Sequence, residues 1–321
     1  MQSNLLITGL GSSGSEHIAS VLRARAIGSS RIIGSGTAAF EAVNASLLAD
    51  EYVVTPGHAD PAWPNSITEI VSKFSVGAVH CYIEEEAALF SSDSQLVKQL
   101  NLKTSSGALH TYESFSTKSS SYHHLSQLGL PVPKLFRCGE VKEGLNYFVK
   151  PNDGFGSIGA RVASGEELRN LCRRGQLKNV VVTEILGSPE FTVDASFVDG
   201  ALLLSVRERQ VVVGGKCIRA RITASAEAQE IVRHIADSFA VPALFNVQMM
   251  TDASTGKLKV TDVNMRPASG LGLSTAAGWR GVEQLAKFLG FEIGGETDTA
   301  TFPRQGISFR RHSHSFIETR P

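Results

Sequence analysis

Hydrophobic and polar positions in the first hundred residues follow two alternating rhythms. Strand-like runs occur at 4–10 (NLLITGL) and 30–36 (SRIIGSG), and residues 78–91 (AVHCYIEEEAALFS) add a strand that leads into a helix. Between the first two runs, residues 15–27 have a helical pattern. Strands that alternate with helices are typical of a parallel sheet with helices on its faces. We therefore predict an N-terminal α/β domain of Rossmann-like fold.

The rhythm changes beyond a boundary expected near residues 103–115 (KTSSGALHTYESF). A helix follows with Leu125 and Leu128 on one side, and Gly129 and Pro131 end it. Strands then dominate: we expect them at 145–150, 160–163, 179–185, 190–198, 201–206, 244–251 and 257–265, with helices at 164–174 and 225–239. Strands and helices that come in blocks indicate an α+β arrangement.

Length and charge limit the classes of protein to consider. A chain of 321 residues is too long for one ordinary core and suits two or three subdomains. Its 31 Lys and Arg residues balance 31 Asp and Glu residues, so no net field favours nucleic acid or an anionic membrane as a partner. No apolar run approaches the roughly 20 residues that span a bilayer. The N-terminal MQSNLLITGLG lacks signal-peptide character. We expect a cytoplasmic protein with neither nucleic acid nor membrane as a partner.

The four cysteines, Cys81, Cys138, Cys172 and Cys217, are scattered along the chain. They form no CxxC pair, and no histidine has the spacing of a zinc ligand beside them. We expect all four to be reduced and buried, as in a cytoplasmic protein.

A G-x-G-x-x-G pattern follows the first strand, at Gly9, Gly11 and Gly14. This pattern suggests a dinucleotide fingerprint, but a dinucleotide site also needs an acidic residue near the end of the second strand. Here that strand ends in 34–36 (GSG). We favour a tight turn whose amides hold an anionic group of a substrate at a helix N-terminus.

The segment YFVKPNDGFGSIGARV, 147–162, places Lys150 and Pro151 at a strand end before a glycine-rich loop. Backbone amides of such a loop can wrap an anion, and the lysine can add its charge. The spacing differs from that of a Walker loop. A simple hairpin with a glycine-rich tip is the alternative.

The segment VVVTEILGSPEFTVDASF, 180–197, contains a strand that ends near Glu184 and turns at Gly187. An extended Glu-Ile-Leu segment can offer backbone N–H and C=O groups to an adenine edge. Glu190, just past the turn, could accept hydrogen bonds from both ribose hydroxyls.

Four arginines lie on the predicted hairpin SVRERQVVVGGKCIRARIT, 205–223. Arg207 and Arg209 share one strand face, and Arg219 and Arg221 lie on the return strand. They form either a solvated face or an anion-binding site, because guanidinium groups match carboxylate and phosphate oxygens.

Two later strands carry polar residues of the kind that bind metals. Gln248 lies among apolar residues in LFNVQMMTD, where a buried amide needs a partner. In KLKVTDVNMRPASG, 257–270, Asp262, Asn264 and Arg266 occupy every second position and so share one strand face. A solvated edge strand is the alternative.

In this order, these segments resemble an ATP-grasp enzyme of the carbamoyl-phosphate-synthase-like branch. The resemblance covers roughly residues 110–290 and rests on Lys118, Lys150-Pro, the 152–159 loop, TEILGSPEFTVD, RER…GG, FNVQ and DVNMRPASG. The final GISFRRHSHSFIE resembles the closing strand of short members. The resemblance implies a pre-ATP-grasp domain at 1–108, a small subdomain at 109–178 and a catalytic subdomain at 179–321.

The resemblance also implies roles for individual residues. Asp262, where relatives more often have Glu, would hold Mg²⁺ with Asn264 and Gln248. One or two ions are expected, with Mn²⁺ as a substitute. Arg266 would contact the transferring phosphoryl group, and Arg207 the acylphosphate. ATP would contact Lys118, Lys150, Gly154, Gly156, Ser157, Glu184, Ile185, Leu186 and Glu190. Candidate substrate contacts are Arg209, Arg219, Ser269 and Gly270.

The function implied is that of an ATP-dependent carboxylate–amine ligase. An acylphosphate forms first, and an amine then attacks it to give an amide or peptide bond on an amino-acid-like substrate, with release of ADP and phosphate. The carboxylate and the amine would be small molecules, and an intramolecular version that closes a lactam stays open, as does a homodimer. The alternatives are a carboxylating or carbamoyl-phosphate-type enzyme that uses bicarbonate, and a nucleotide-binding module without catalysis.

Overall fold

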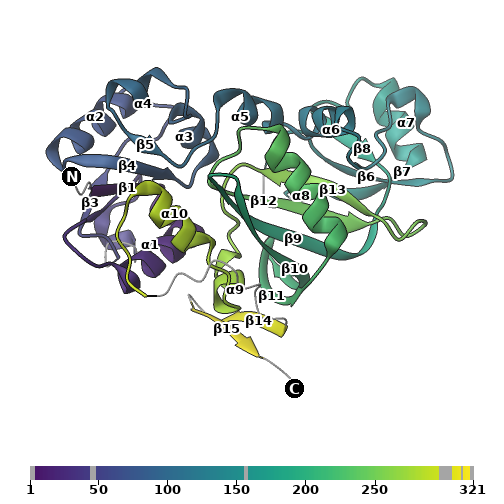
Figure 1. Cartoon of the computed structure of the whole chain (residues 1–321). Helices are drawn as coiled ribbons and strands as arrows, with labels where there is room; N and C mark the ends of the chain where they lie inside the picture. The colour runs from purple at the N-terminus through teal and green to yellow at the C-terminus, as the bar shows by residue number, and fades with distance from the viewer. Residues whose placement is uncertain (1–3, 44–47, 155–157, 296–305, 312–313, 319–321) are drawn as a thin grey trace.

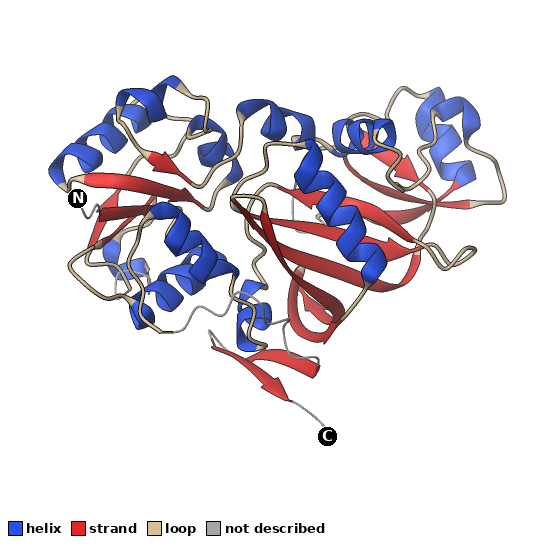
Figure 2. Cartoon of the chain, viewed as in Figure 1, coloured by secondary structure: helices blue, strands red, loops and turns tan. Residues whose placement is uncertain are grey.

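The structure, a computed structural model, describes residues 4–43, 48–154, 158–295, 306–311 and 314–318. It comprises three sheets with helices packed against them (Figure 1, Figure 2). The N-terminal sheet and the small sheet lie at opposite ends of the view in Figure 1, and the large sheet lies between them. No helix in these described ranges is long and apolar enough to cross a membrane.

The N-terminal sheet is parallel, as the alternating rhythm predicts, and its strand order is β3-β2-β1-β4-β5. Leu5 and Ile7 of the central strand join one hydrophobic cluster and Leu6 joins another, because successive side chains point to opposite faces. The strands are β1 (Asn4–Thr8), β2 (Ile32–Gly36), β3 (Glu51–Val54), β4 (Val76–Cys81) and β5 (Lys103–Thr104); the helices are α1 (Ser13–Arg25), α2 (Trp63–Lys73), α3 (Glu84–Leu89) and α4 (Gln95–Gln99), with the short η1 (Phe40–Ala42).

The small sheet is antiparallel, with the order β7-β6-β8, and carries its own hydrophobic cluster. Its elements are α6 (Lys118–Gln127), η3 (Cys138–Glu140), β6 (Asn146–Pro151), β7 (Arg161–Ser164), α7 (Gly165–Arg173) and β8 (Val180–Thr183). Because β8 belongs to this sheet, we propose that the small subdomain ends at the 184–186 segment that follows β8 and not at residue 178.

The large sheet has seven antiparallel strands in the order β13-β12-β9-β10-β11-β14-β15. The helix α8 (Ala226–Ser238) crosses one face of it, over β9 and β10 (Figure 1). The strands are β9 (Gly187–Val198), β10 (Ala201–Val213), β11 (Lys216–Thr223), β12 (Leu244–Thr251), β13 (Leu258–Asn264), β14 (Gly306–Arg311) and β15 (His314–Glu318). The parallel sheet followed by antiparallel sheets confirms the predicted α/β and α+β fold class.

Two late helices, α9 (Leu271–Ala276) and α10 (Gly281–Leu289), return the chain to the N-terminal domain. Leu285 and Leu289 of α10 share a hydrophobic cluster with Ile18 and Leu22 of α1. The sequence pattern did not predict either helix. The N-terminal domain is therefore completed by residues from the far end of the chain.

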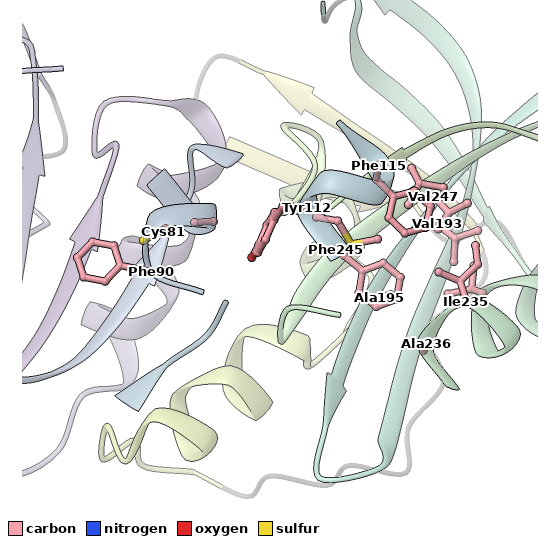
Figure 3. Packing of buried hydrophobic residues seen from close by; sticks show 14 of the residues in the cluster. Cys81, Phe90, Tyr112, Phe115, Val193, Ala195, Ile235, Ala236, Phe245 and Val247 are labelled. Atoms are coloured by element: carbon pink, nitrogen blue, oxygen red, sulfur yellow. The ribbon is translucent and has the colours of Figure 1, made fainter. Parts of the chain in front are cut away.

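The helix α5 (Leu109–Phe115) joins the N-terminal domain to the large sheet through buried rings. In Figure 3, Tyr112 lies between Cys81 of the N-terminal domain and Phe245 of the large sheet, and Phe115 packs against the large sheet. All four belong to one cluster. The boundary region thus contains a packed helix rather than an open linker.

The expectation of four reduced cysteines is wrong. Cys138 of η3, which is exposed, and Cys172 of α7, which is half-buried, form a disulfide across 34 residues. Cys81 and Cys217 are free and buried, as predicted. The packing of α7 against η3 brings the first pair together, and spacing along the chain carries no information about that contact. Cysteine usage therefore gives no support to the cytoplasmic expectation.

Candidate functional site

The residues predicted to bind a metal lie on β13 and its neighbour β12. Asp262 pairs with Gln248, and Asn264 pairs with Asn246, in an antiparallel register. Directly opposite side chains of such a pair lie on the same face, so the carboxylate and both amides of the predicted set lie together. The Nδ2 of Asn264 donates to Oδ1 of Asn246 at 3.3 Å, a contact that engages its amino group rather than its carbonyl oxygen.

These residues suit Mg²⁺ bound together with nucleotide phosphates. The set contains one carboxylate, Asp262, and carboxamide oxygens, all of them hard ligands. Within the described ranges, no group of three or more His, Cys, Asp or Glu side chains is arranged to hold a metal ion. Mg²⁺ usually takes only one or two protein carboxylates and completes its shell with phosphates and water, so the residues present fit this ion.

Two lysines of the small subdomain point to the same strand. Nζ of Lys118 is 2.8 Å from the carbonyl oxygen of Gly154 and 3.9 Å from Oδ1 of Asp262. Nζ of Lys150 donates to the carbonyl oxygen of Thr261 at 2.8 Å and lies 5.3 Å from the ring centroid of Tyr122. The structure therefore brings both predicted phosphate-binding lysines to the predicted metal face.

Burial lowers the pKa of Lys150 to about 8. The negative charge of Asp262 opposes this shift, and the positive charge of Lys118 adds to it. A bound anion stabilises the charged form of such a lysine, because the anion replaces the stabilisation that water gives to an exposed ammonium group. The surroundings of Lys150 thus suit a phosphate group.

The glycine-rich loop starts against the N-terminus of α6. The backbone N–H of Lys118 donates to the carbonyl oxygen of Asn152, and that of Ser119 to its Oδ1, both at 2.9 Å. Gly154 has a φ of +111°, which favours glycine. Gly156 and Ser157, predicted to contact ATP, lie outside the described residues.

The predicted adenine segment, 184–186, is an extended connection between β8 and β9 and belongs to neither sheet. The Glu184 carboxylate accepts from the N–H of Lys134 at 2.7 Å and from Nζ of Lys259 at 2.6 Å. Its side chain is thus held by protein groups. Ile185 is 47% exposed, and Leu186 is half-buried.

Glu190, the predicted ribose contact, forms an ion pair with Arg209. Oε1 of Glu190 is 2.5 Å from Nη1 of Arg209, and Nη2 of that arginine donates to the carbonyl oxygen of Gly215 at 3.0 Å. Glu190 remains 32% exposed, whereas Arg209 is nearly buried. The structure therefore leaves the glutamate accessible and fixes the arginine beneath it.

Arg207, the predicted acylphosphate contact, is 1% exposed. Its Nε and Nη2 donate to the two carboxylate oxygens of Asp194 at 2.6 and 3.0 Å, and Ser274 also donates to Asp194. Burial works against the charge of Arg207, but the nearby Asp194 carboxylate raises its pKa overall. The sequence did not indicate Asp194 or Ser274, since nothing in the pattern links them to Arg207.

Arg207 lies directly below Gly270, one of the predicted substrate contacts. A Cβ atom on Gly270 would come within 2.7 Å of Nη1 of Arg207. Gly270 precedes α9, and the half-buried Ser269 lies just before it. The guanidinium therefore supports the chain segment that follows Arg266.

The four arginines of the hairpin do not come together. Arg209 pairs with the buried Ala220, so Arg219 and Arg221, on either side of Ala220, point to the opposite face and are exposed. On that face Arg221 lies 3.8 Å from Glu208. Arg219 is thus separated from Arg207 and Arg209 by the thickness of the sheet.

The N-terminal domain contributes two residues that the sequence did not single out. Oε1 of Glu84 accepts a hydrogen bond from the N–H of Met265 at 3.3 Å, and its Oε2 lies 3.9 Å from Nε of Arg266. The Arg266 guanidinium lies 5.9 Å from the ring centroid of Tyr82. Burial raises the pKa of Glu84 to about 7, although Arg266 and the Met265 hydrogen bond oppose the shift. The position of Glu84 just past a parallel strand was the one available signal, because ligands bind at that end of such sheets.

The G-x-G-x-x-G pattern has a packing role here. A Cβ atom on Gly14 would lie 2.2 Å from the Tyr82 ring, and Gly9 and Gly11 have φ values of +62° and +126°. The third glycine thus makes room for the tyrosine that lies beside Arg266.

Comparisons with known proteins agree with this arrangement. Residues 176–312 match the family model described as "ATP-grasp in the biosynthetic pathway with Ter operon". A search of curated proteins found no match to the chain.

Three of the similar solved structures have low sequence identity and closely similar folds. N5-carboxyaminoimidazole synthetase from Staphylococcus aureus, complexed with ADP, is 15% identical (TM-score 0.71; 91% of this chain and 79% of that one). The biotin carboxylase domain of Hydrogenobacter thermophilus 2-oxoglutarate carboxylase, with MgADP, ADP and bicarbonate, is 13% identical. Its TM-score is 0.74, and the match covers 97% of this chain and 75% of that one. L-amino acid ligase from Bacillus licheniformis is 16% identical. Its TM-score is 0.69, and the match covers 96% of this chain and 79% of that one. The family match over residues 176–312 and the shared fold agree with the ATP-grasp resemblance, and the chain has the fold of these ATP-grasp enzymes.

Proposed function

We propose that the chain is an ATP-dependent ligase that joins a small carboxylate to an amine through an acylphosphate. The observation that carries the proposal is the convergence of Lys118 and Lys150 on Asp262 and its strand. Phosphoryl transfer depends mainly on alignment and on neutralising charge. This cluster supplies both.

Each residue of the site has its own role in this reaction. Lys118 and Lys150 bind the phosphates of ATP, and Arg266 binds the phosphoryl group that is transferred. Asp262, Asn264 and Gln248 hold one or two Mg²⁺ ions, which neutralise phosphate charge when bound. The 184–186 backbone faces adenine, and the accessible Glu190 carboxylate accepts the ribose hydroxyls.

The reaction has two steps. An oxygen of the substrate carboxylate attacks the γ-phosphorus of ATP, ADP leaves, and an acylphosphate forms. The nitrogen of the amine then attacks the acyl carbon; the carbon–oxygen bond to phosphate breaks, phosphate leaves with the electron pair, and the nitrogen loses a proton. The product is an amide or peptide bond.

Two other functions make different predictions. The similar biotin carboxylase domain was solved with bicarbonate, so a carboxylating or carbamoyl-phosphate-type activity is the second candidate. It requires turnover that depends on bicarbonate and not on an amino acid. A binding module without catalysis would be expected to lose the metal-binding carboxylate first, and Asp262 is present.

A phosphate-release screen tests the proposal. The chain is incubated with ATP, Mg²⁺ and pairs of amino acids, with and without bicarbonate, and Mn²⁺ replaces Mg²⁺ in a parallel series. We expect release to depend on an amino-acid pair; release with one amino acid alone would indicate lactam closure. Release that needs only bicarbonate would overturn the ligase assignment in favour of the second candidate.

The variant Asp262→Asn links any activity to this site. It removes the carboxylate of the metal face, so we expect phosphate release to fall at least about 100-fold, since even outer-shell changes at metal sites cost 10–100-fold. Circular dichroism should show an intact fold. Asp237→Asn, an exposed change on α8, is the control. Near-normal release by a folded Asp262→Asn protein would end the metal assignment.

A further inference from the structure

Glu84 reaches the site from a different domain than the residues assigned to ATP. It is the first residue of α3 and follows the end of β4 in the parallel sheet. In the order β3-β2-β1-β4-β5, β1 and β4 are the neighbours between which the strand order reverses. Open parallel sheets bind ligands at this switch point, outside the carboxyl ends of their strands. Glu84 is thus placed where the N-terminal domain is expected to present a substrate.

The contacts of Glu84 leave it open to a further partner. It lies 3.9 Å from Arg266, and both side chains are 25% exposed. The pair of Arg207 and Asp194 differs, since it has two short hydrogen bonds and is almost completely buried. The Met265 N–H engages Oε1 of Glu84, so Oε2 is the oxygen that faces Arg266 across the wider gap.

The charges around the reacting group also call for a carboxylate at this place. Lys118, Lys150 and Arg266 are assigned to phosphate groups, and none of these side chains can accept a hydrogen bond from an amine. Of the described carboxylates that contact the end of β13, Asp262 is assigned to the metal. Glu84 is the other, on the side of Arg266 that faces the N-terminal domain.

We propose that Glu84 binds the amine substrate and delivers it to the acylphosphate beside Arg266. This inference rests on the proposed ligase function. The ammonium group of the substrate first gives one proton to water, and an N–H of the resulting amine donates to Oε2 of Glu84. The nitrogen then attacks the acyl carbon, the carbon–oxygen bond to phosphate breaks, and phosphate leaves with the electron pair. The proton that the nitrogen loses passes to the Glu84 carboxylate. Arg266 lies beside both Glu84 and the Tyr82 ring.

Hydroxylamine provides a test that separates the two steps. It is a small, uncharged nucleophile at neutral pH and traps acylphosphates as hydroxamates without the need for a carboxylate to attract it. The fastest amino-acid pair from the screen supplies the carboxylate and the natural amine. Glu84→Gln keeps an acceptor for Met265 but loses the charge and the capacity to take a proton. Glu85→Gln changes the net charge equally at the exposed neighbour and is the matched control.

For Glu84→Gln we expect hydroxamate formation and the KM for ATP to stay near wild type. Its kcat/KM for the amine should fall about 100-fold, the low end of the effect of a positioned acid–base group. Glu85→Gln should match wild type in both reactions. A parallel loss of hydroxamate and amide in Glu84→Gln would show that the residue only holds Met265 and Arg266 in place, and an unchanged variant would also overturn the inference. If the wild type forms no ATP-dependent hydroxamate, the ligase function itself fails.

Discussion

At the scale of single residues, spacing predicted which side chains share a face and did not predict how deeply they lie. A period of two placed Asp262 and Asn264 together, because alternation is a property of any strand. The same period placed Arg207 and Arg209 together but could not show that their face is buried. The position of Glu84 at a strand end hinted at a ligand site, but its contact with Met265 could not be predicted, since the two residues lie 181 positions apart.

The burial of Lys150 predicts a pH dependence of ATP binding. With its pKa lowered to about 8, Lys150 carries its charge below pH 8 and loses it above. ATP phosphates bind the charged form, so the dissociation constant should rise about tenfold between pH 7 and pH 9, as expected for the loss of one required proton. Lys150→Arg stays charged throughout and should remove this rise. Titration with a non-hydrolysable ATP analogue at pH 7, 8 and 9 measures the effect, and equal rises in both proteins would contradict it.

The buried pair of Arg207 and Asp194 predicts a loss of stability. Among the described residues, Arg207→Met leaves the buried Asp194 carboxylate with Ser274 as its remaining side-chain partner, so the free energy of unfolding should fall by about 3–5 kcal/mol. The double variant Asp194→Leu/Arg207→Met removes both charges and should be less destabilised than the single one. Urea denaturation measures both. Arg219→Met, at an exposed position, should stay within about 0.5 kcal/mol of wild type. A fully stable Arg207→Met protein with low kcat would favour direct contact between Arg207 and the acylphosphate.

At the scale of elements, strands were easier to predict than the late helices. The expected strand 244–251 coincides with β12, and 257–265 exceeds β13 by one residue at each end. In α10, by contrast, residues 281–286 are all buried. Its Val282, Leu285, Ala286 and Leu289 nevertheless follow the i, i+3, i+4, i+7 spacing of an amphipathic helix, a signal that the sequence interpretation missed. Its partner, α1, also lies some 250 residues earlier in the chain, a separation that no local pattern spans.

The contact between α1 and Tyr82 predicts the effect of a small change. Gly14→Ala puts a methyl group where the Tyr82 ring lies, 2.2 Å from its nearest atom. Overpacking of this kind costs about 1–3 kcal/mol, and displacement of the ring removes the support beside Arg266. We expect a lower melting temperature and a lower kcat together. Gly139→Ala, with nothing within 4 Å of the new Cβ atom and no positive φ, is the control. An unchanged kcat in the Gly14→Ala protein would separate Tyr82 from the function of Arg266.

At the scale of the whole molecule, the site is an assembly of all three sheets. The small subdomain reaches β13 through Lys118 and Lys150, and the N-terminal domain reaches the end of β13 through Glu84. Each contact joins segments more than 100 residues apart in the sequence. The order of the motifs in the sequence indicated the class of protein. The contribution of the N-terminal domain could be recognised only from the three-dimensional fold.

This assembly predicts that the chain binds a mononucleotide and not a dinucleotide. The ATP contacts proposed above lie on two subdomains and exist only in the folded chain, so ATP with Mg²⁺ should raise the melting temperature. A ligand at 100 times its dissociation constant stabilises a native state by about 2.7 kcal/mol. NAD and NADP should give no shift, because β2 ends in Ser35 and Gly36 without an acidic residue for the ribose, and Gly14 is occupied by packing against Tyr82. Thermal unfolding with each nucleotide, with and without Mg²⁺, measures this. In Asp262→Asn, added Mg²⁺ should no longer increase the shift that ATP produces. Stabilisation by NADP and none by ATP would contradict both the nucleotide site on β13 and the interpretation of the glycine turn.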